Sequence, residues 1–167
     1  MSKPAIPPKV VAELNRQINQ ELAAEHSYHA LSAWCADQNL KGFAAFFAEQ
    51  GAEEQEHAGK IMSHLSDRRV LPELGSVPAL KREFASLLEA AQHAQAMEKA
   101  NTRGIHSVYE TAHAAKDYPA QVLMHWFINE QVEEEAQTNM IYEQLKMIGE
   151  DHIGGIFMLD HRVSKRE

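Results

Sequence analysis

Glutamate occupies positions where a packed helix would carry hydrocarbon. Four long segments of the sequence can each be followed along one helical face at steps of three and four residues. Each face starts apolar, meets a carboxylate near its middle and ends apolar or aromatic; the four acids are Glu21, Glu54, Glu98 and Glu134. Burying an ionised carboxylate is very costly unless it is paired or bound to a metal, and His57 is the only obvious cation on these faces. The pattern therefore predicts a metal centre assembled from separate helices.

Glu54 and His57 form a Glu-x-x-His pattern, which puts a carboxylate and an imidazole on one helical face. Together with single glutamates from other helices, this pattern matches the ligand set of di-iron carboxylate proteins built on helical bundles. On its own it more often marks a solvated surface, and we expect the neighbouring Glu56 to be exposed. The acids on the other three faces favour metal, and hard oxygens with imidazole suit iron or manganese. We expect Glu54 to bridge two ions, because it shares a face with His57.

Helix-forming residues fill the long stretches between the prolines, and no run of alternating β-branched residues indicates a strand. The sequence therefore predicts an all-α fold. We expect helices over about Pro8–Asp37, Gly42–Asp67 and Ala79–Ala115, a fourth helix with Pro119 near its start that ends near Ile148, and a short fifth helix over Ile153–Val163.

The connections between these helices predict their order in space. The segment Arg68–Pro78 holds two prolines and Gly75 and should be a loop. Fully extended, it could reach about 35 Å, which is enough to run along a bundle and join two parallel neighbours. The other breaks are tight and imply antiparallel neighbours. One long crossover among four long helices is the ferritin-like arrangement of a four-helix bundle.

Length and composition set further bounds. A chain of 167 residues suits one domain, spanning residues 1–167. The net charge of −8 argues against nucleic acid or an anionic membrane as a partner, since both need a basic surface. The single cysteine, Cys35, excludes a disulfide framework or thiolate cluster within the chain. Neither a secretory signal nor an apolar run of membrane-spanning length is visible, so we expect a cytoplasmic protein.

With these residues in place, the chain resembles the bacterial non-haem ferritins over nearly its whole length. The resemblance implies an iron-oxidising and iron-storing protein: a ferroxidase with Fe²⁺ and O₂ as substrates, no haem, and a hollow homo-oligomeric shell of 24 subunits around a ferric mineral. It rests on the metal-site glutamates and His57 and on these further sequence features: Trp34-Cys35, Asp117-Tyr118-Pro119, Trp126 and the acidic run 130–135.

The resemblance also implies which residues bind each ion. A first iron site would use Glu21, Glu54 and His57, and a second would use Glu54, Glu98 and Glu134 with Gln131 close by. A third, weaker iron site would use Glu53, Glu130 and Glu133. Tyr28 matches the family's tyrosine beside the centre and could supply an electron or a hydrogen bond.

Three alternatives fit less well. Bacterioferritins carry a second Glu-x-x-His and a haem-binding methionine, but this chain has Gln137 after Glu134 and Gln55 after Glu54. A peroxidase of the rubrerythrin type is another di-iron carboxylate candidate, although one cysteine cannot build its rubredoxin module. A helical binding module without metal would leave the four glutamates on core faces unexplained.

Overall fold

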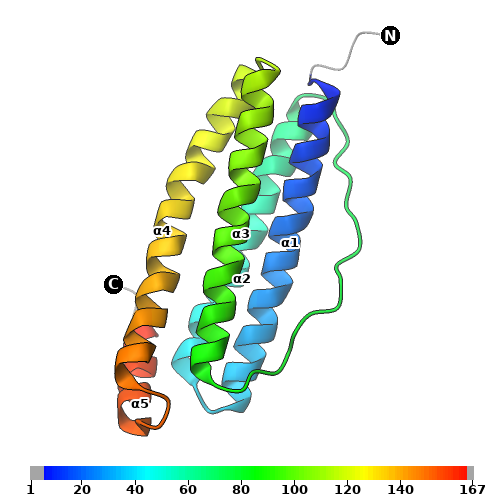
Figure 1. The fold of residues 1–167 in the computed structure, drawn as a ribbon. Coiled ribbons are helices and arrows are strands. Elements are labelled where there is room, and N and C mark those ends of the chain that lie inside the picture. The colour runs from blue at the N-terminus through cyan, green and yellow to red at the C-terminus, as the bar shows by residue number, and fades with distance from the viewer. Residues whose placement is uncertain (1–5, 165–167) are drawn as a thin grey trace.

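Helices account for most of the computed structural model, which describes residues 6–164 (Figure 1). Within that range there are five α-helices and no strand. Their bounds are α1 Pro8–Asp37, α2 Lys41–Asp67, α3 Leu87–Ala114, α4 Tyr118–Ile148 and α5 Ile153–Val163. The all-α prediction is confirmed. Every helix boundary except the start of the third helix agrees with the predicted boundary to within one residue. None of these helices combines the length and the apolar character needed to cross a bilayer.

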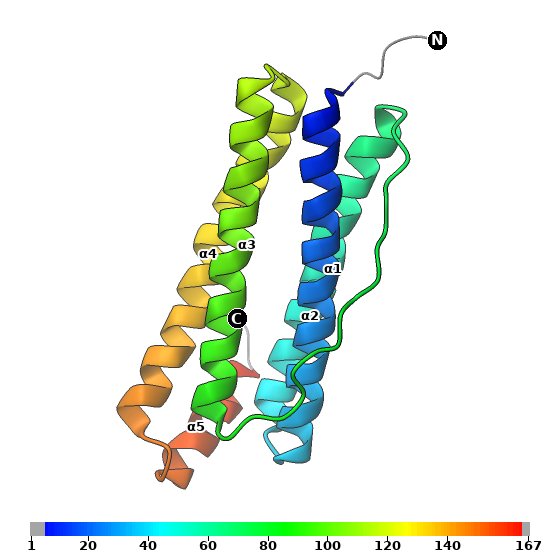
Figure 2. The ribbon, with the colours of Figure 1, turned by 45° about the vertical axis from the view of Figure 1, so that its right-hand side comes forward.

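The crossover between α2 and α3 sets the topology. It runs the length of the bundle beside α1, so that α2 and α3 are parallel while α1–α2 and α3–α4 are antiparallel (Figures 1 and 2). Two asparagines of α1 hold it in place: Asn15 Oδ1 accepts from the Glu73 amide at 3.0 Å, and Asn19 Oδ1 accepts from the Gly75 amide at 2.7 Å. The predicted long crossover is confirmed.

The third helix begins at Leu87, eight residues later than the predicted Ala79. Ser86 adopts an extended backbone conformation, and its hydroxyl accepts from the Glu89 amide at 3.1 Å. The Glu89 carboxylate reaches back to the Ala85 amide. This arrangement is a variant of the capping box: the Ser86 hydroxyl satisfies one amide of the first helical turn, and the Glu89 carboxylate accepts from the residue before the N-cap instead of from the N-cap itself. The start predicted at Ala79 was therefore wrong, because Ser-x-x-Glu at 86–89 is the stronger start signal.

Buried aspartates fix two other helix ends. Asp117 precedes α4, and its Oδ1 accepts from the Ala120 amide at 3.1 Å and from Arg68 at 2.8 Å. Asp160 lies in α5 and accepts from the Gly42 amide at 3.1 Å and the Phe43 amide at 2.8 Å at the start of α2. A carboxylate at a helix N-terminus also complements the helix dipole. Asp160 therefore anchors α5 to the end of the bundle.

The core consists of two apolar clusters. One cluster, near α5, includes Leu31, Phe43 and Leu145; the other, toward the opposite end, includes Leu14, Ile61 and Phe127. Between their positions along the helices lies a set of buried polar side chains: Gln17, Glu21, Gln50, Glu54, His57, Glu98, Asn101, Gln131, Glu134 and Thr138. Apolar packing above and below therefore surrounds a polar layer at mid-bundle.

Candidate metal centre

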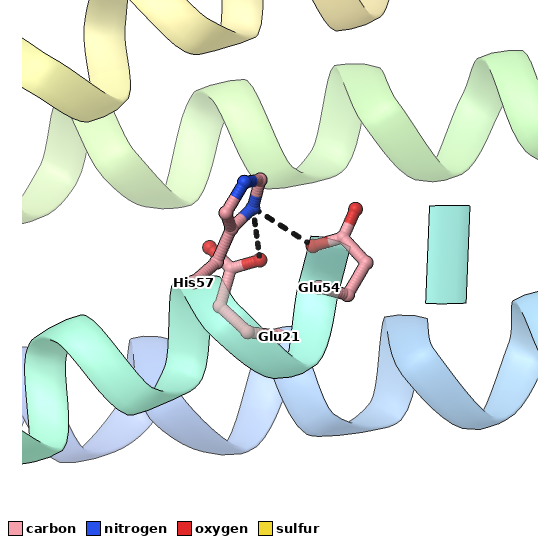
Figure 3. A group of neighbouring side chains, drawn as sticks. All are labelled: Glu21, Glu54 and His57. Atoms are coloured by element: carbon pink, nitrogen blue, oxygen red, sulfur yellow. Dashed lines mark ion pairs between the residues drawn. The ribbon is translucent and has the colours of Figure 1, made fainter. Parts of the chain in front are cut away.

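Glu21 of α1 meets Glu54 and His57 of α2 in this polar layer. His57 Nδ1 lies 3.3 Å from Glu54 Oε2 and 3.8 Å from Glu21 Oε2. Figure 3 shows the imidazole nitrogen directed toward both carboxylates. All three side chains are at most 3% exposed. Their donor atoms lie close enough together to ligate one ion. The rings of Trp126 and Phe127 pack nearly perpendicular to the imidazole, with ring centroids 5.5 and 5.8 Å from its own.

Glu98 of α3 and Glu134 of α4 face the same layer from the other half of the bundle. Tyr28 donates a hydrogen bond to Glu98 Oε1, and Gln131 Nε2 donates to Glu98 Oε2 at 3.1 Å. Glu134 is 3% exposed. The structure therefore brings the predicted ligands of both iron sites, together with Gln131 and Tyr28, into one buried region.

Several atoms of this layer have no hydrogen-bond partner: Glu21 Oε2, Glu54 Oε2, His57 Nδ1 and Glu134 Oε2. Within residues 6–164, no lysine or arginine forms an ion pair with any of the four glutamates. Unpartnered buried polar atoms are rare, and each needs an explanation such as a bound ion. A layer of hard oxygens with one imidazole nitrogen suits a divalent or trivalent cation.

Burial and mutual repulsion set the protonation of the carboxylates. Burial, followed by the charge of Glu21, raises the pKa of Glu54 well above its ordinary value. Burial and the charge of Glu98 raise the pKa of Glu134 to about 9. Burial also raises the pKa of Glu98, against the hydrogen bonds from Tyr28 and Gln131. Without a cation, the layer therefore holds protons where a metal centre would hold positive charge.

Glu21 differs from the other three carboxylates. Burial alone would raise its pKa, but interactions with His57, with Glu54 and with the Gln17 amide outweigh burial and lower it. The pKa of His57 is raised. Burial alone would lower it, but the interaction with the Glu21 carboxylate outweighs burial. Glu21 and His57 therefore stabilise each other as an ion pair in the absence of metal.

The residues of the expected third site are divided. Ligand atoms of Glu130, His57 and Glu134 lie close enough together to hold one metal ion, a grouping that the sequence did not predict. Glu53 accepts from Gln50 Nε2 at 3.0 Å, and it lies close enough to Glu134 to raise the pKa of that group. Glu133 is exposed, and in the described part of the chain it belongs to neither candidate metal group.

Gln17 is a residue of this layer that sequence reasoning missed. It is fully buried, and its Nε2 donates to Glu21 Oε1 at 2.7 Å. The available signal was its position one turn before Glu21, on the same face of the helix. That signal is weak, because a glutamine in a helix is ordinarily exposed.

Comparisons with known proteins agree with this geometry. A family model described as a ferritin-like domain matches residues 11–148. The chain is 40% identical over 138 residues to a bacterial non-heme ferritin of Staphylococcus haemolyticus, and the matched region covers 83% of each chain. It is 38% identical over 143 residues to one of Staphylococcus epidermidis, with 86% of each chain covered. Among solved structures, an open pore ferritin from the archaeon Archaeoglobus fulgidus superposes with a TM-score of 0.94 at 35% identity, covering 98% of this chain and 100% of the other.

Proposed function

The chain belongs to the ferritin family, and on that premise we propose that it oxidises Fe²⁺ with O₂ at a two-iron centre inside the bundle and stores the ferric product. Iron is the substrate and the stored cargo. The observation that carries the proposal is the buried layer of four glutamates and one histidine, with four unpartnered donor atoms. Cations would satisfy these atoms, whereas without cations the raised pKa values of Glu54 and Glu134 keep protons on these two carboxylates.

The arrangement supports two adjacent ions with Glu54 between them. Glu54 interacts with Glu21 of the first predicted site and with Glu98 of the second, since both raise its pKa. A carboxylate in that position can give one oxygen to each ion. Two cations held about 3.5–4 Å apart can then act together on one small molecule.

The ligand set favours the oxidised product. Each Fe²⁺ gives up one electron, so a pair supplies the two electrons that O₂ takes up. Anionic hard oxygens stabilise Fe³⁺ more than Fe²⁺, and each proton that leaves Glu54 or Glu134 adds a negative charge to the ligand set. Tyr28 and Gln131 hold Glu98 from both of its oxygens, which fixes the orientation of this ligand.

Removing the proposed bridge tests the function. Glu54→Ala and His57→Ala should lower the initial rate of Fe²⁺ oxidation by at least about tenfold while the helical circular dichroism signal remains. Glu56→Ala is the matched control, because Glu56 lies on α2 but points to solvent. Stopped-flow absorbance and an oxygen electrode give the rates. Oxidation at the parent rate in either site variant would refute the assignment.

A third ion is proposed beside the pair, held by Glu53, Glu130 and Glu133. The proximity of Glu130 and Glu53 to Glu134 supports a third ion, since both carboxylates raise the pKa of Glu134. Glu130→Ala should change the O₂ consumed per iron more than it changes the initial rate. An unchanged ratio with a strongly reduced rate would instead make Glu130 part of the primary centre.

Storage requires assembly, and we propose the 24-subunit shell of the family. Apolar side chains are exposed along the end of α4 and on α5: Met147, Ile153, Phe157 and Met158. Exposed apolar patches of this kind mark protein interfaces. On gel filtration, 24 copies of an 18.8 kDa chain should elute near about 450 kDa. Elution as a monomer or dimer would contradict the shell.

A further inference from the structure

A row of hydrogen bonds leads from the surface of α1 to Glu21. Arg16 NH1 donates to Gln17 Oε1 at 3.3 Å, and Gln17 Nε2 donates to Glu21 Oε1 at 2.7 Å. The other oxygen of Glu21, Oε2, faces His57 and has no hydrogen-bond partner. The two oxygens of one carboxylate therefore have different surroundings: Oε1 accepts from Gln17, and Oε2 faces His57 within the candidate metal group.

The guanidinium determines the direction of this row. Arginine has only donors, so the Gln17 group that faces Arg16 must be the carbonyl oxygen. The amide nitrogen of Gln17 then faces Glu21, where it can donate to a carboxylate. A flipped amide would set its oxygen against a carboxylate oxygen and its nitrogen against a cation, so the reverse orientation is repelled at both ends.

Arg16 is itself held in place by several contacts. It pairs with Glu13 at 3.0 Å, and it donates to Gln20 Oε1 at 2.8 Å and to the carbonyl of Gly104 on α3 at 2.9 Å. Gly104 also provides the space, because a Cβ there would lie 2.3 Å from Gln17 Oε1 and 2.6 Å from Gln20 Oε1. The close approach of α1 and α3 at this glycine therefore fixes both glutamine side chains.

We propose that Gln17, oriented by Arg16, is a positioning residue for the first iron site: it holds the Glu21 carboxylate with Oε1 turned toward Gln17 and Oε2 toward His57, so that Glu21 binds iron through Oε2. This rests on the proposed function. Without Gln17, both oxygens of Glu21 are free, and the carboxylate can rotate or chelate one ion through both. Partners of metal ligands commonly set orientation in this way, and their loss weakens metal binding 10–100-fold.

Cobalt binding to the intact protein tests the proposal without relying on turnover. Gln17→Met keeps the length and volume of the side chain but removes its donor. It should weaken Co²⁺ binding by about tenfold and lower the intensity of the visible Co²⁺ bands, because an additional carboxylate oxygen raises the coordination number. Gln95→Met is the matched control, since the half-buried Gln95 donates from α3 to Asn139 on α4 at 2.7 Å and its hydrogen bond involves neither Arg16 nor Glu21. It should leave the affinity and the spectrum as in the parent.

A double-mutant cycle separates positioning from a general structural role. In a Glu21→Ala background, Gln17→Met should change Co²⁺ affinity by no more than about twofold, because the residue through which Gln17 acts is gone. An equal loss in both backgrounds would overturn the proposal. If Gln17→Met does not fold, Arg16→Met, at a side chain 39% exposed, releases the orientation of Gln17 and should change the spectrum in the same direction.

The outcomes distinguish this inference from the function on which it rests. If the parent protein binds no Co²⁺ at the centre, the proposed function itself fails, and the positioning role fails with it. If the parent binds Co²⁺ and Gln17→Met gives the same affinity and spectrum, only the positioning role is refuted.

Discussion

The protonation of the buried glutamates affects both the stability of the fold and its affinity for metal ions. Glu54, Glu98 and Glu134 all have raised pKa values, with burial as the largest cause. In the metal-free protein these groups favour the protonated form, which burial penalises far less than the charged form. Metal ions must displace these protons, so metal affinity and acidity are coupled.

We therefore expect the metal-free protein to lose stability as the pH rises. The pKa of Glu134 is about 9 in the fold and near its ordinary acidic value in the unfolded chain. The stabilising contribution of its proton is complete below the unfolded value and is lost progressively as the pH rises toward about 9. Thermal unfolding in chelator between about pH 6 and pH 9 should show a falling Tm. Glu134→Gln, a neutral isostere, should flatten that profile.

A parallel pH profile for the parent and Glu134→Gln would contradict this assignment, because it would mean that Glu134 is already ionised in the fold. Saturating Zn²⁺ provides a second control. The bound ion replaces the protons, so the decline with pH should disappear. Glu54 and Glu98 remain in the variant, and their raised pKa values leave it some pH dependence.

The five candidate ligands could be predicted from the sequence. The family resemblance also placed Tyr28 and Gln131 near the centre, but neither their common partner, Glu98, nor the role of Gln17 could be predicted. Glu21, Glu54, His57, Glu98 and Glu134 each interrupt an apolar face, and a single helix is enough to reveal that. The hydrogen bonds to these ligands depend on distances between helices. Tyr28 reaches Glu98 from another helix, and Gln17 is enclosed because Gly104 lets α3 approach α1. Such distances arise only in the packed bundle.

Among the helices, α5 depends most on one anchor. It is short, and within the described residues only Leu159 and Asp160 of this helix are buried. Asp160 accepts two amides at the start of α2, and its own backbone passes so close to Gly42 that a Cβ there would lie 1.8 Å from the Asp160 carbonyl oxygen. The docking of α5 therefore depends on the absence of a side chain at position 42.

A pair of glycine substitutions tests this docking. Gly42→Ala should displace α5 and speed amide hydrogen exchange across residues 153–163 by at least about tenfold. Gly59→Ala is on the same helix, where an added Cβ meets nothing within 4 Å. It should leave α5 protected and raise stability by about 0.5–1 kcal/mol, since alanine is the better helix former. Equal protection of α5 in both variants would show that it docks through other contacts.

Helix boundaries differ in how well local signals define them. Pro8 and Pro119 fit the first turns of α1 and α4, and Gly149 ends α4. The error at the third helix arose because residues 79–85 contain good helix formers but no cap. In the structure Phe84 instead packs against Trp34, with ring centroids 5.5 Å apart. Tertiary packing therefore overrides the local helix propensity of this segment.

The molecule as a whole separates chemistry from storage. All candidate ligands come from one chain, so the proposed oxidation site can form within a single bundle. Storage, in contrast, needs an enclosed volume that one bundle of helices cannot supply. The exposed apolar side chains at the α4–α5 end, among them Met147 and Met158 at 86% and 77% exposure, form the surface through which we propose that copies associate.

Charging that surface should therefore dissociate the assembly and leave the chemistry intact. Met158→Asp places a charge where neighbouring copies would exclude water, and such a charge is costly unless it is paired. Sedimentation velocity should show a species far smaller than the parent, whereas Met158→Leu keeps the side chain apolar and should sediment as the parent does.

Per chain, Met158→Asp should still oxidise Fe²⁺ rapidly, because Glu21, Glu54 and His57 lie in a single bundle. The ferric product should then precipitate instead of remaining in solution. A variant that dissociates and also loses rapid oxidation would show that the centre depends on assembly, against the intra-chain site.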